Sequence, residues 1–250
     1  MDDWIVPPWY HPTTLLALDD EERLLEGLAM ALGDGFRFQG CTTAREARDR
    51  LASSPTGDAQ GGRAELEVFG DPLDETRFSR VSVMLVDYAL SGLNGLDFIR
   101  GLEGPRPRSI LYSGMSDIDS VEVALREGVV DCFIAKHDRQ FFDRLEASVD
   151  VLARRFFMER GRAVVGGSVA LLSHPGAAAL LEGLRERHGC VEHYLYRDFS
   201  GFLLIDEDGR AYRLRIGGEE TPADTTVVEE GVVEGEGWRW RLGVGGLRGC

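Results

Sequence analysis

Short, continuously apolar segments alternate with amphipathic helical patterns through residues 13–158. The clearest apolar segments cover residues 14–18, 81–86, 109–112 and 131–135, and a segment with apolar residues at helical spacing follows each of them. A strand that is buried on both faces has an unbroken run of apolar residues. Strands that alternate with helices along the chain favour a parallel sheet covered by helices on both sides. The pattern therefore predicts an α/β domain over residues 13–158.

The rest of the chain follows a different pattern. Residues 53–80 break the alternation with the stretch SSPTGDAQGG and a mixed acidic segment, which predicts a partly disordered surface insertion. Residues 1–12 are interpreted as an N-terminal leader. Beyond residue 158, a helix at 174–187 precedes a series of strand-like segments, so residues 159–250 are predicted to form a smaller, β-rich α+β domain.

The charge of the chain limits its partners. It has 28 Lys and Arg residues against 43 Asp and Glu residues, a formal net charge of −15, which repels the phosphate backbone of nucleic acids. No apolar run approaches the ~20 residues that a membrane-spanning helix needs, and the first residues lack the features of a secretory signal. The four cysteines are too widely spaced for a zinc-type pair or a small disulfide framework, so we expect a cytoplasmic protein without a membrane span.

Polar residues stand at the carboxyl ends of the predicted strands. In parallel sheets ligands bind beyond these ends, so we expect the side chains to meet at one edge of the sheet. Lys136 is the only lysine of the chain, and all other basic residues counted in the net charge are arginines. The compact ammonium of a lysine interacts with anions differently from the planar guanidinium of an arginine. The strand-end residues are Asp19, Asp20, Asp87, Ser113 and Lys136.

These residue types suit phosphoryl chemistry. Three carboxylates at one sheet edge stay ionised together only around a divalent cation, and an all-oxygen ligand set favours Mg²⁺. An Asp beside Mg²⁺ can attack phosphorus and become an aspartyl phosphate, while an ammonium neutralises charge on the phosphoryl oxygens. We therefore interpret Asp87 as the phosphoacceptor and Asp19 and Asp20 as metal ligands. Lys136 would supply the cation, and Ser113 the hydroxyl that hydrogen-bonds a phosphoryl oxygen.

Four segments within residues 13–158 follow one another in a characteristic order: LLALDDEE, LVDYALSGLNGLDFI, ILYSGMSD and DCFIAKH. Together they resemble the receiver domain of bacterial two-component response regulators. The resemblance implies a five-stranded, doubly wound, flavodoxin-like sheet and phosphorylation of Asp87 by a histidine kinase or a phosphotransfer protein. It implies that the backbone carbonyl of Ala89 joins the three Asp residues around Mg²⁺. It also implies that Ser113 and Phe133 shift together as a switch.

Three positions depart from the pattern of this family. Ser91 stands where the family usually has Pro, so the loop after Asp87 is expected to be less rigid. His137 stands where the family usually has a Pro after the Lys. A cis bond before a residue other than Pro costs ~3–4 kcal/mol, so the bond after Lys136 is expected to be trans or else strained. Phe133 replaces the commoner Tyr and cannot form a hydroxyl hydrogen bond.

The sequence thus predicts a phosphoacceptor signalling protein rather than an enzyme. Residues 159–250 contain no basic recognition helix, so we expect an output domain that contacts an unknown protein or ligand instead of DNA; a homodimer stays an option. Two alternatives remain open. Ser91 and His137 leave room for a pseudo-receiver scaffold that works without phosphorylation. A phosphohydrolase of the haloacid-dehalogenase type would need a second Asp two residues after the nucleophile, where Ala89 stands.

Overall fold

The computed structural model describes residues 4–32, 36–55, 67–104, 106–114, 118–166, 169–217, 226–233 and 237–245. The chain divides into two compact units, neither of which is continuous in sequence. The parallel-sheet unit comprises Pro12–Thr56 and Thr76–Phe156. The antiparallel-sheet unit comprises Met1–His11, Gly57–Glu75 and Phe157–Cys250.

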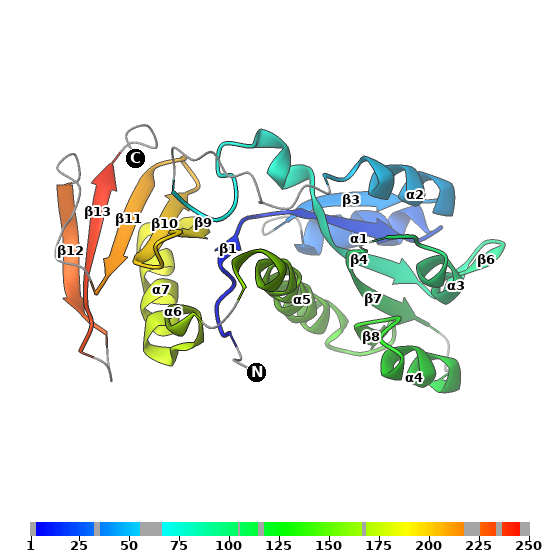
Figure 1. The fold of residues 1–250 in the computed structure, drawn as a ribbon. Coiled ribbons are helices and arrows are strands. Elements are labelled where there is room, and N and C mark those ends of the chain that lie inside the picture. The colour runs from blue at the N-terminus through cyan, green and yellow to red at the C-terminus, as the bar shows by residue number, and fades with distance from the viewer. Residues whose placement is uncertain are drawn as a thin grey trace. The chain divides into compact units, whose positions relative to one another are not determined.

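The parallel-sheet unit contains a five-stranded sheet in the order β3-β2-β4-β7-β8 (Figure 1). Every neighbouring pair is parallel. All residues of the two central strands β2 and β4 are buried, as their continuous apolar sequences predict. The strands are β2 (Thr14–Leu18), β3 (Arg37–Cys41), β4 (Val81–Asp87), β7 (Arg108–Ser113) and β8 (Cys132–Ala135).

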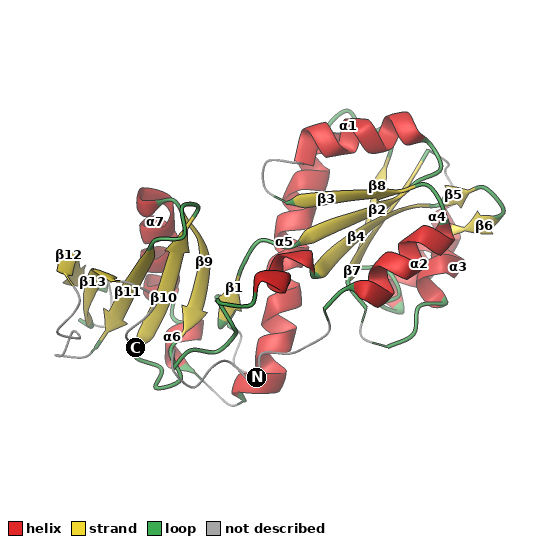
Figure 2. Cartoon of the chain, turned by 90° about the horizontal axis from the view of Figure 1, so that it is seen from above, coloured by secondary structure: helices red, strands yellow, loops and turns green. Residues whose placement is uncertain are grey.

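Helices lie on both faces of this sheet (Figure 2). Their apolar sides pack with the strands into a core that includes the fully buried Leu16, Met84, Phe98 and Leu111. The helices are α1 (Glu22–Leu32), α2 (Ala44–Ser53), α3 (Gly95–Arg100), α4 (Ile118–Arg126) and α5 (Phe141–Val165). The strand order and the two helical layers confirm the doubly wound, flavodoxin-like fold.

The antiparallel-sheet unit contains a six-stranded sheet in the order β1-β9-β10-β11-β13-β12. Two helices, α6 (Ala170–Ser173) and α7 (Pro175–His188), precede its central strands in the chain. A β-rich α+β domain after the receiver-like part is thereby confirmed. The strands are β1 (Trp9–Tyr10), β9 (Cys190–Leu195), β10 (Gly201–Asp206), β11 (Ala211–Ile216), β12 (Thr226–Val232) and β13 (Arg239–Gly245).

The predicted N-terminal leader is instead part of the antiparallel-sheet unit. Trp9 and Tyr10 form the edge strand β1 and pair with Tyr194 and His193 of β9. Trp4 and Trp9 are buried, because the apolar start of the chain supplies one edge of a sheet whose other strands lie nearly two hundred residues later. The described residues 4–11 are therefore part of that unit and not a separate leader.

The segment predicted as a surface insertion also differs from expectation. Residues 56–66 lie outside the described residues, but Val68 forms a bridge to Tyr196 and is buried. The backbone N–H of Phe69 donates to the carbonyl of Leu195 at 2.8 Å. A short 3₁₀ helix, η3 (Glu75–Ser79), then leads into β4. Residues 67–75 thus belong to the antiparallel-sheet unit, and α5 continues past the predicted domain boundary to Val165.

Within the described ranges, every helix is too short or too polar to cross a membrane.

Candidate metal centre

The candidate site lies where the parallel strands end. Asp19 and Asp20 directly follow β2, and Asp87 is the last residue of β4. Asp87 pairs in register with Tyr112, and Ser113 at the end of β7 pairs with Ala135 at the end of β8. Because these pairings are parallel, the carboxyl ends of all four strands meet at one edge of the sheet.

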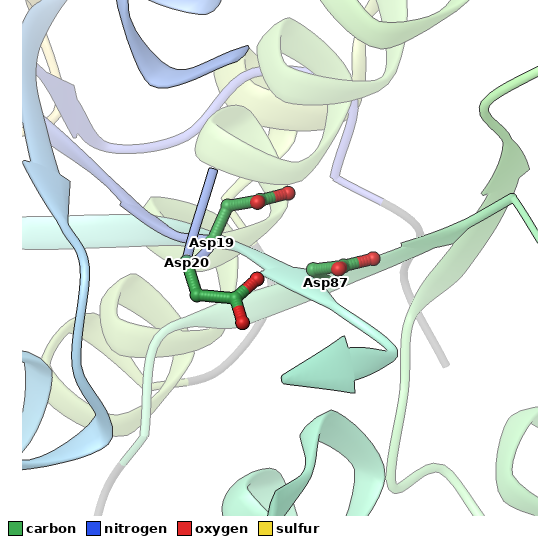
Figure 3. A group of neighbouring side chains, drawn as sticks. All are labelled: Asp19, Asp20 and Asp87. Atoms are coloured by element: carbon green, nitrogen blue, oxygen red, sulfur yellow. The ribbon is translucent and has the colours of Figure 1, made fainter. Parts of the chain in front are cut away.

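Three carboxylates come together there. Asp19, Asp20 and Asp87 each offer an oxygen, and these oxygens lie within 4.8 Å of one another (Figure 3). Asp19 is fully buried and Asp87 nearly so, whereas Asp20 is exposed at the rim. Carboxylates at this spacing repel one another unless a cation lies among them, and an all-oxygen donor set is what Mg²⁺ takes in proteins. The residues present therefore fit a divalent cation.

Lys136 supplies one positive charge to this group. Its Nζ lies 2.9 Å from Oδ2 of Asp19 and 3.1 Å from Oδ1 of Asp87. Burial disfavours the charged ammonium, but the interactions with the carboxylates of Asp19 and Asp87 outweigh it, so the pKa of Lys136 is raised. The backbone N–H of Lys136 donates to the carbonyl of Ser113 at 2.8 Å, which fixes the end of β8 against β7. The bond from Lys136 to His137 is trans, as expected.

One ammonium does not balance the charge of Asp87. Burial raises the pKa of Asp87 above its ordinary value, and the hydrogen bond from Lys136 only partly opposes this effect. The carboxylate of Asp87 therefore stands in a place that disfavours its negative charge in the protein alone. A bound cation would correct that imbalance, which is a second reason why the donor set fits a metal ion.

Asp19 is held by donors on both of its oxygens. The backbone N–H of Glu21 donates to Oδ1 at 2.8 Å, which forms a turn directly before helix α1. Lys136 donates to Oδ2, and the hydroxyl of Tyr112 donates to the same oxygen at 3.0 Å. Burial raises the pKa of Tyr112, so this phenol remains a neutral donor. Tyr112 was not predicted as a site residue, because a Tyr in an apolar strand cannot be told from an ordinary core residue by sequence alone.

Asp20 is bound by Ser91, a second partner that was not predicted from the sequence. The backbone N–H of Ser91 donates to Oδ2 of Asp20 at 3.0 Å, and the Ser91 hydroxyl donates to the same oxygen. The hydrogen bond from this hydroxyl lowers the pKa of Asp20. The one sequence feature that pointed to this position was Ser91 itself, which stands where the receiver family usually has Pro.

The remaining predicted residues lie near the same edge. Ser113 is buried at the end of β7, one residue beyond the Asp87–Tyr112 pair. Phe133 pairs with Leu111 in register, is half-buried and packs against the core of the parallel-sheet unit. Ala89 is exposed and starts a short strand directly after the loop residue that follows Asp87. The structure thus groups the three acids, brings Lys136 into contact with Asp19 and Asp87, and places Ser113 and Phe133 on the neighbouring strands β7 and β8.

A doubly wound sheet with acidic residues and a lysine at its carboxyl edge fits a flavodoxin-like receiver fold. No protein-family model and no curated protein matches the chain. Among solved structures, the chain matches the structure of the Legionella pneumophila response regulator LqsR, with 23% sequence identity and a TM-score of 0.77. The match covers 96% of this chain and 89% of that chain, so both units share their fold with that protein.

Two shorter matches cover little more than half of the chain. One is the signal receiver domain of an HD domain-containing protein from Pseudomonas fluorescens Pf-5 (17% identity, TM-score 0.47, 61% of this chain and 95% of that chain). The other is a response regulator receiver protein from Pseudomonas putida (21% identity, TM-score 0.43, 57% of this chain and 98% of that chain). With TM-scores below 0.5, they add nothing to the fold assignment.

Proposed function

We propose that this chain is a response regulator in which Asp87 accepts a phosphoryl group in a Mg²⁺-dependent reaction. The observation that carries the proposal is the contact of Lys136 with both Asp19 and Asp87 beside a third carboxylate, that of Asp20. The shared fold with the Legionella response regulator over 96% of this chain supports it. The phosphoryl donor would be a sensor histidine kinase or a phosphotransfer protein, in the cytoplasm.

In this reaction an oxygen of Asp87 forms a new bond to phosphorus while the P–N bond of the donor's phosphohistidine breaks. The leaving imidazole keeps the bonding electrons and takes up a proton. Bound Mg²⁺, held by Asp19, Asp20, Asp87 and the carbonyl of Ala89, would neutralise charge on the transferring group. Lys136, already 3.1 Å from Asp87, is in reach of a phosphoryl oxygen on that carboxylate.

Two residues on neighbouring strands would change position in response to the new phosphoryl group. The hydroxyl of Ser113 would donate a hydrogen bond to one of its oxygens and move toward Asp87. Phe133 is only half-buried on β8 and could turn inward as Ser113 moves. This coupled shift would carry the signal to the antiparallel-sheet unit. That unit would act on a protein or a ligand rather than on DNA, since the chain is strongly acidic.

Binding of beryllofluoride tests this function without a kinase. The full-length protein with Mg²⁺ and beryllofluoride should give a new, slowly exchanging ¹⁹F NMR signal, and Asp87→Asn should abolish that signal. Absence of the signal from a folded wild type would favour a pseudo-receiver scaffold. Steady hydrolysis of p-nitrophenyl phosphate would instead favour an aspartate-nucleophile phosphohydrolase.

A further inference from the structure

The loop that follows Asp87 is a tight hairpin. Strands β5 (Ala89–Leu90) and β6 (Leu93–Asn94) pair antiparallel, and the two-residue turn between them is Ser91-Gly92. Gly92 has a φ of +79°, a backbone conformation that residues with a Cβ rarely adopt. The hairpin thereby presents Ser91 at its tip.

The base of this hairpin is closed directly after the end of β4. The backbone N–H of Gly95 donates to the carbonyl of Tyr88 at 2.8 Å. A Cβ on Gly95 would come within 2.0 Å of the backbone oxygen of Asp87, so only glycine fits there. Asn94 caps helix α3 with its side chain. The hairpin is therefore a defined structure, and its tip can hold another group in place.

The group that the tip holds is the carboxylate of Asp20. Both donors of Ser91, its N–H and its hydroxyl, bind the single oxygen Oδ2. Asp20 is exposed, and an exposed Asp side chain ordinarily samples several rotamers. Two donors from one anchored residue limit this freedom and set the direction of the carboxylate.

We propose that Ser91 is a positioning residue of the metal centre, which fixes the exposed carboxylate of Asp20 toward Asp19 and Asp87 before the cation binds. The inference rests on the proposed function, since the cation is the Mg²⁺ of the phosphoacceptor site. Asp19 accepts hydrogen bonds from the buried Tyr112 hydroxyl and from Lys136, both on the sheet side of the site. The exposed carboxylate of Asp20 is instead bound by the hairpin residue Ser91.

Proline, which stands at this position in the receiver family that the motifs resemble, has neither a backbone N–H nor a hydroxyl and could make neither hydrogen bond. Since Mg²⁺ demands near-ideal octahedral geometry, the placement of each carboxylate matters for its affinity. If the Asp20 side chain is already held in one rotamer before the cation binds, less side-chain entropy is lost on binding.

The test is calorimetric titration of the full-length protein with MgCl₂. Ser91→Ala should weaken Mg²⁺ binding about three- to tenfold, the effect of one lost hydrogen bond to a charged group that stays solvated. Ser91→Thr keeps the hydroxyl and should bind within about twofold of wild type. Ser53→Ala, an exposed change at the end of α2, is the matched control and should leave the affinity unchanged.

The outcomes separate this inference from the proposed function. Equal or tighter Mg²⁺ binding by Ser91→Ala, with an unchanged melting temperature, overturns the positioning role. The same conclusion follows if Ser91→Thr loses as much affinity as Ser91→Ala. A folded wild type that binds no Mg²⁺ overturns the metal centre itself. Weakened binding in Ser91→Ala together with restored binding in Ser91→Thr supports the proposal.

Discussion

The hydroxyl of Tyr112 and the ammonium of Lys136 share one acceptor, Oδ2 of Asp19, at 3.0 Å and 2.9 Å. The ammonium also lies 5.0 Å from the centroid of the Tyr112 ring. A buried carboxylate is stable only with well-placed donors, and here a neutral phenol and a cation supply them. This arrangement holds one side of the acidic group rigidly and leaves the other side open to solvent at Asp20.

Tyr112→Phe is expected to lower the free energy of unfolding by about 1.5–3 kcal/mol, because a buried hydrogen bond to a charged group is lost while the ring stays in place. Tyr88→Phe is the matched control: its hydroxyl makes a longer, 3.3 Å hydrogen bond to the hydroxyl of Ser120, and a smaller loss is expected. Urea unfolding at pH 7 measures both. A Tyr112→Phe protein as stable as wild type would contradict the account.

Lys136→Met removes the ammonium from between two buried carboxylates. We expect a loss of about 2–3 kcal/mol, less than the ~3–5 kcal/mol of a fully buried pair because the Lys136 side chain is 24% exposed. MgCl₂ should restore part of the stability, since a cation replaces the missing charge. Thermal unfolding with MgCl₂ or with EDTA checks this.

The double variant Lys136→Met/Asp87→Asn gives the control for that experiment. Removal of the Asp87 charge should recover part of the stability and should make Mg²⁺ less effective, because one carboxylate is gone. If Lys136→Met alone is fully stable in EDTA, the charge balance described for the site is wrong.

The buried thiols are expected to react slowly. Burial raises the pKa of both Cys41 and Cys190 to about 11, so at pH 8 only about one in a thousand of each would be thiolate, the reactive form. As pH rises toward 11 the ionised fraction grows, and the folded state loses stability because the unfolded thiols ionise earlier. Alkylation by iodoacetamide at pH 8, read by peptide mass spectrometry, should label Cys41 and Cys190 far faster in urea than in buffer. Equal rates in the two conditions would contradict their burial.

The first residues should contribute to the stability of the antiparallel-sheet unit. Trp9 is buried in strand β1, and Trp9→Ala is expected to cost about 3–5 kcal/mol. Ile5→Ala is the control, because Ile5 is half-exposed and its loss should cost well under 1 kcal/mol. Tryptophan fluorescence during urea unfolding follows this unit. A Trp9→Ala protein that unfolds like wild type would indicate that residues 1–12 are a leader after all.

The acids and the lysine of the site could be predicted from the sequence, whereas the residues that donate hydrogen bonds to the acids could not. The strand ends at Asp19, Asp87 and Lys136 were identifiable because an apolar run and the polar residue that closes it are neighbours in sequence, and parallel topology then brings the ends together. The residues that donate hydrogen bonds to the acids were not identifiable in this way. The hydrogen bond from Tyr112 to Asp19 spans 93 residues, and that from Ser91 to Asp20 spans 71 residues. Nothing local distinguishes these side chains from a core tyrosine or a turn serine.

The same limit explains the domain boundaries. Trp9 pairs with Tyr194, and Val68 with Tyr196, so two distant segments complete the antiparallel sheet. Such partners cannot be read from local patterns, because a two-residue edge strand has no periodicity of its own. Only the pairing itself reveals that the apolar start and residues 67–75 belong to the antiparallel-sheet unit.

The most direct test of the central claim is phosphorylation of the full-length protein by acetyl phosphate, followed by intact-protein mass spectrometry. With MgCl₂, the wild type should gain the mass of one phosphoryl group, and fragmentation after reduction with borohydride should place it on Asp87. EDTA and Asp87→Asn should each prevent the gain. A wild type that is folded but gains no mass, or that carries the phosphoryl group on another residue, would contradict the account.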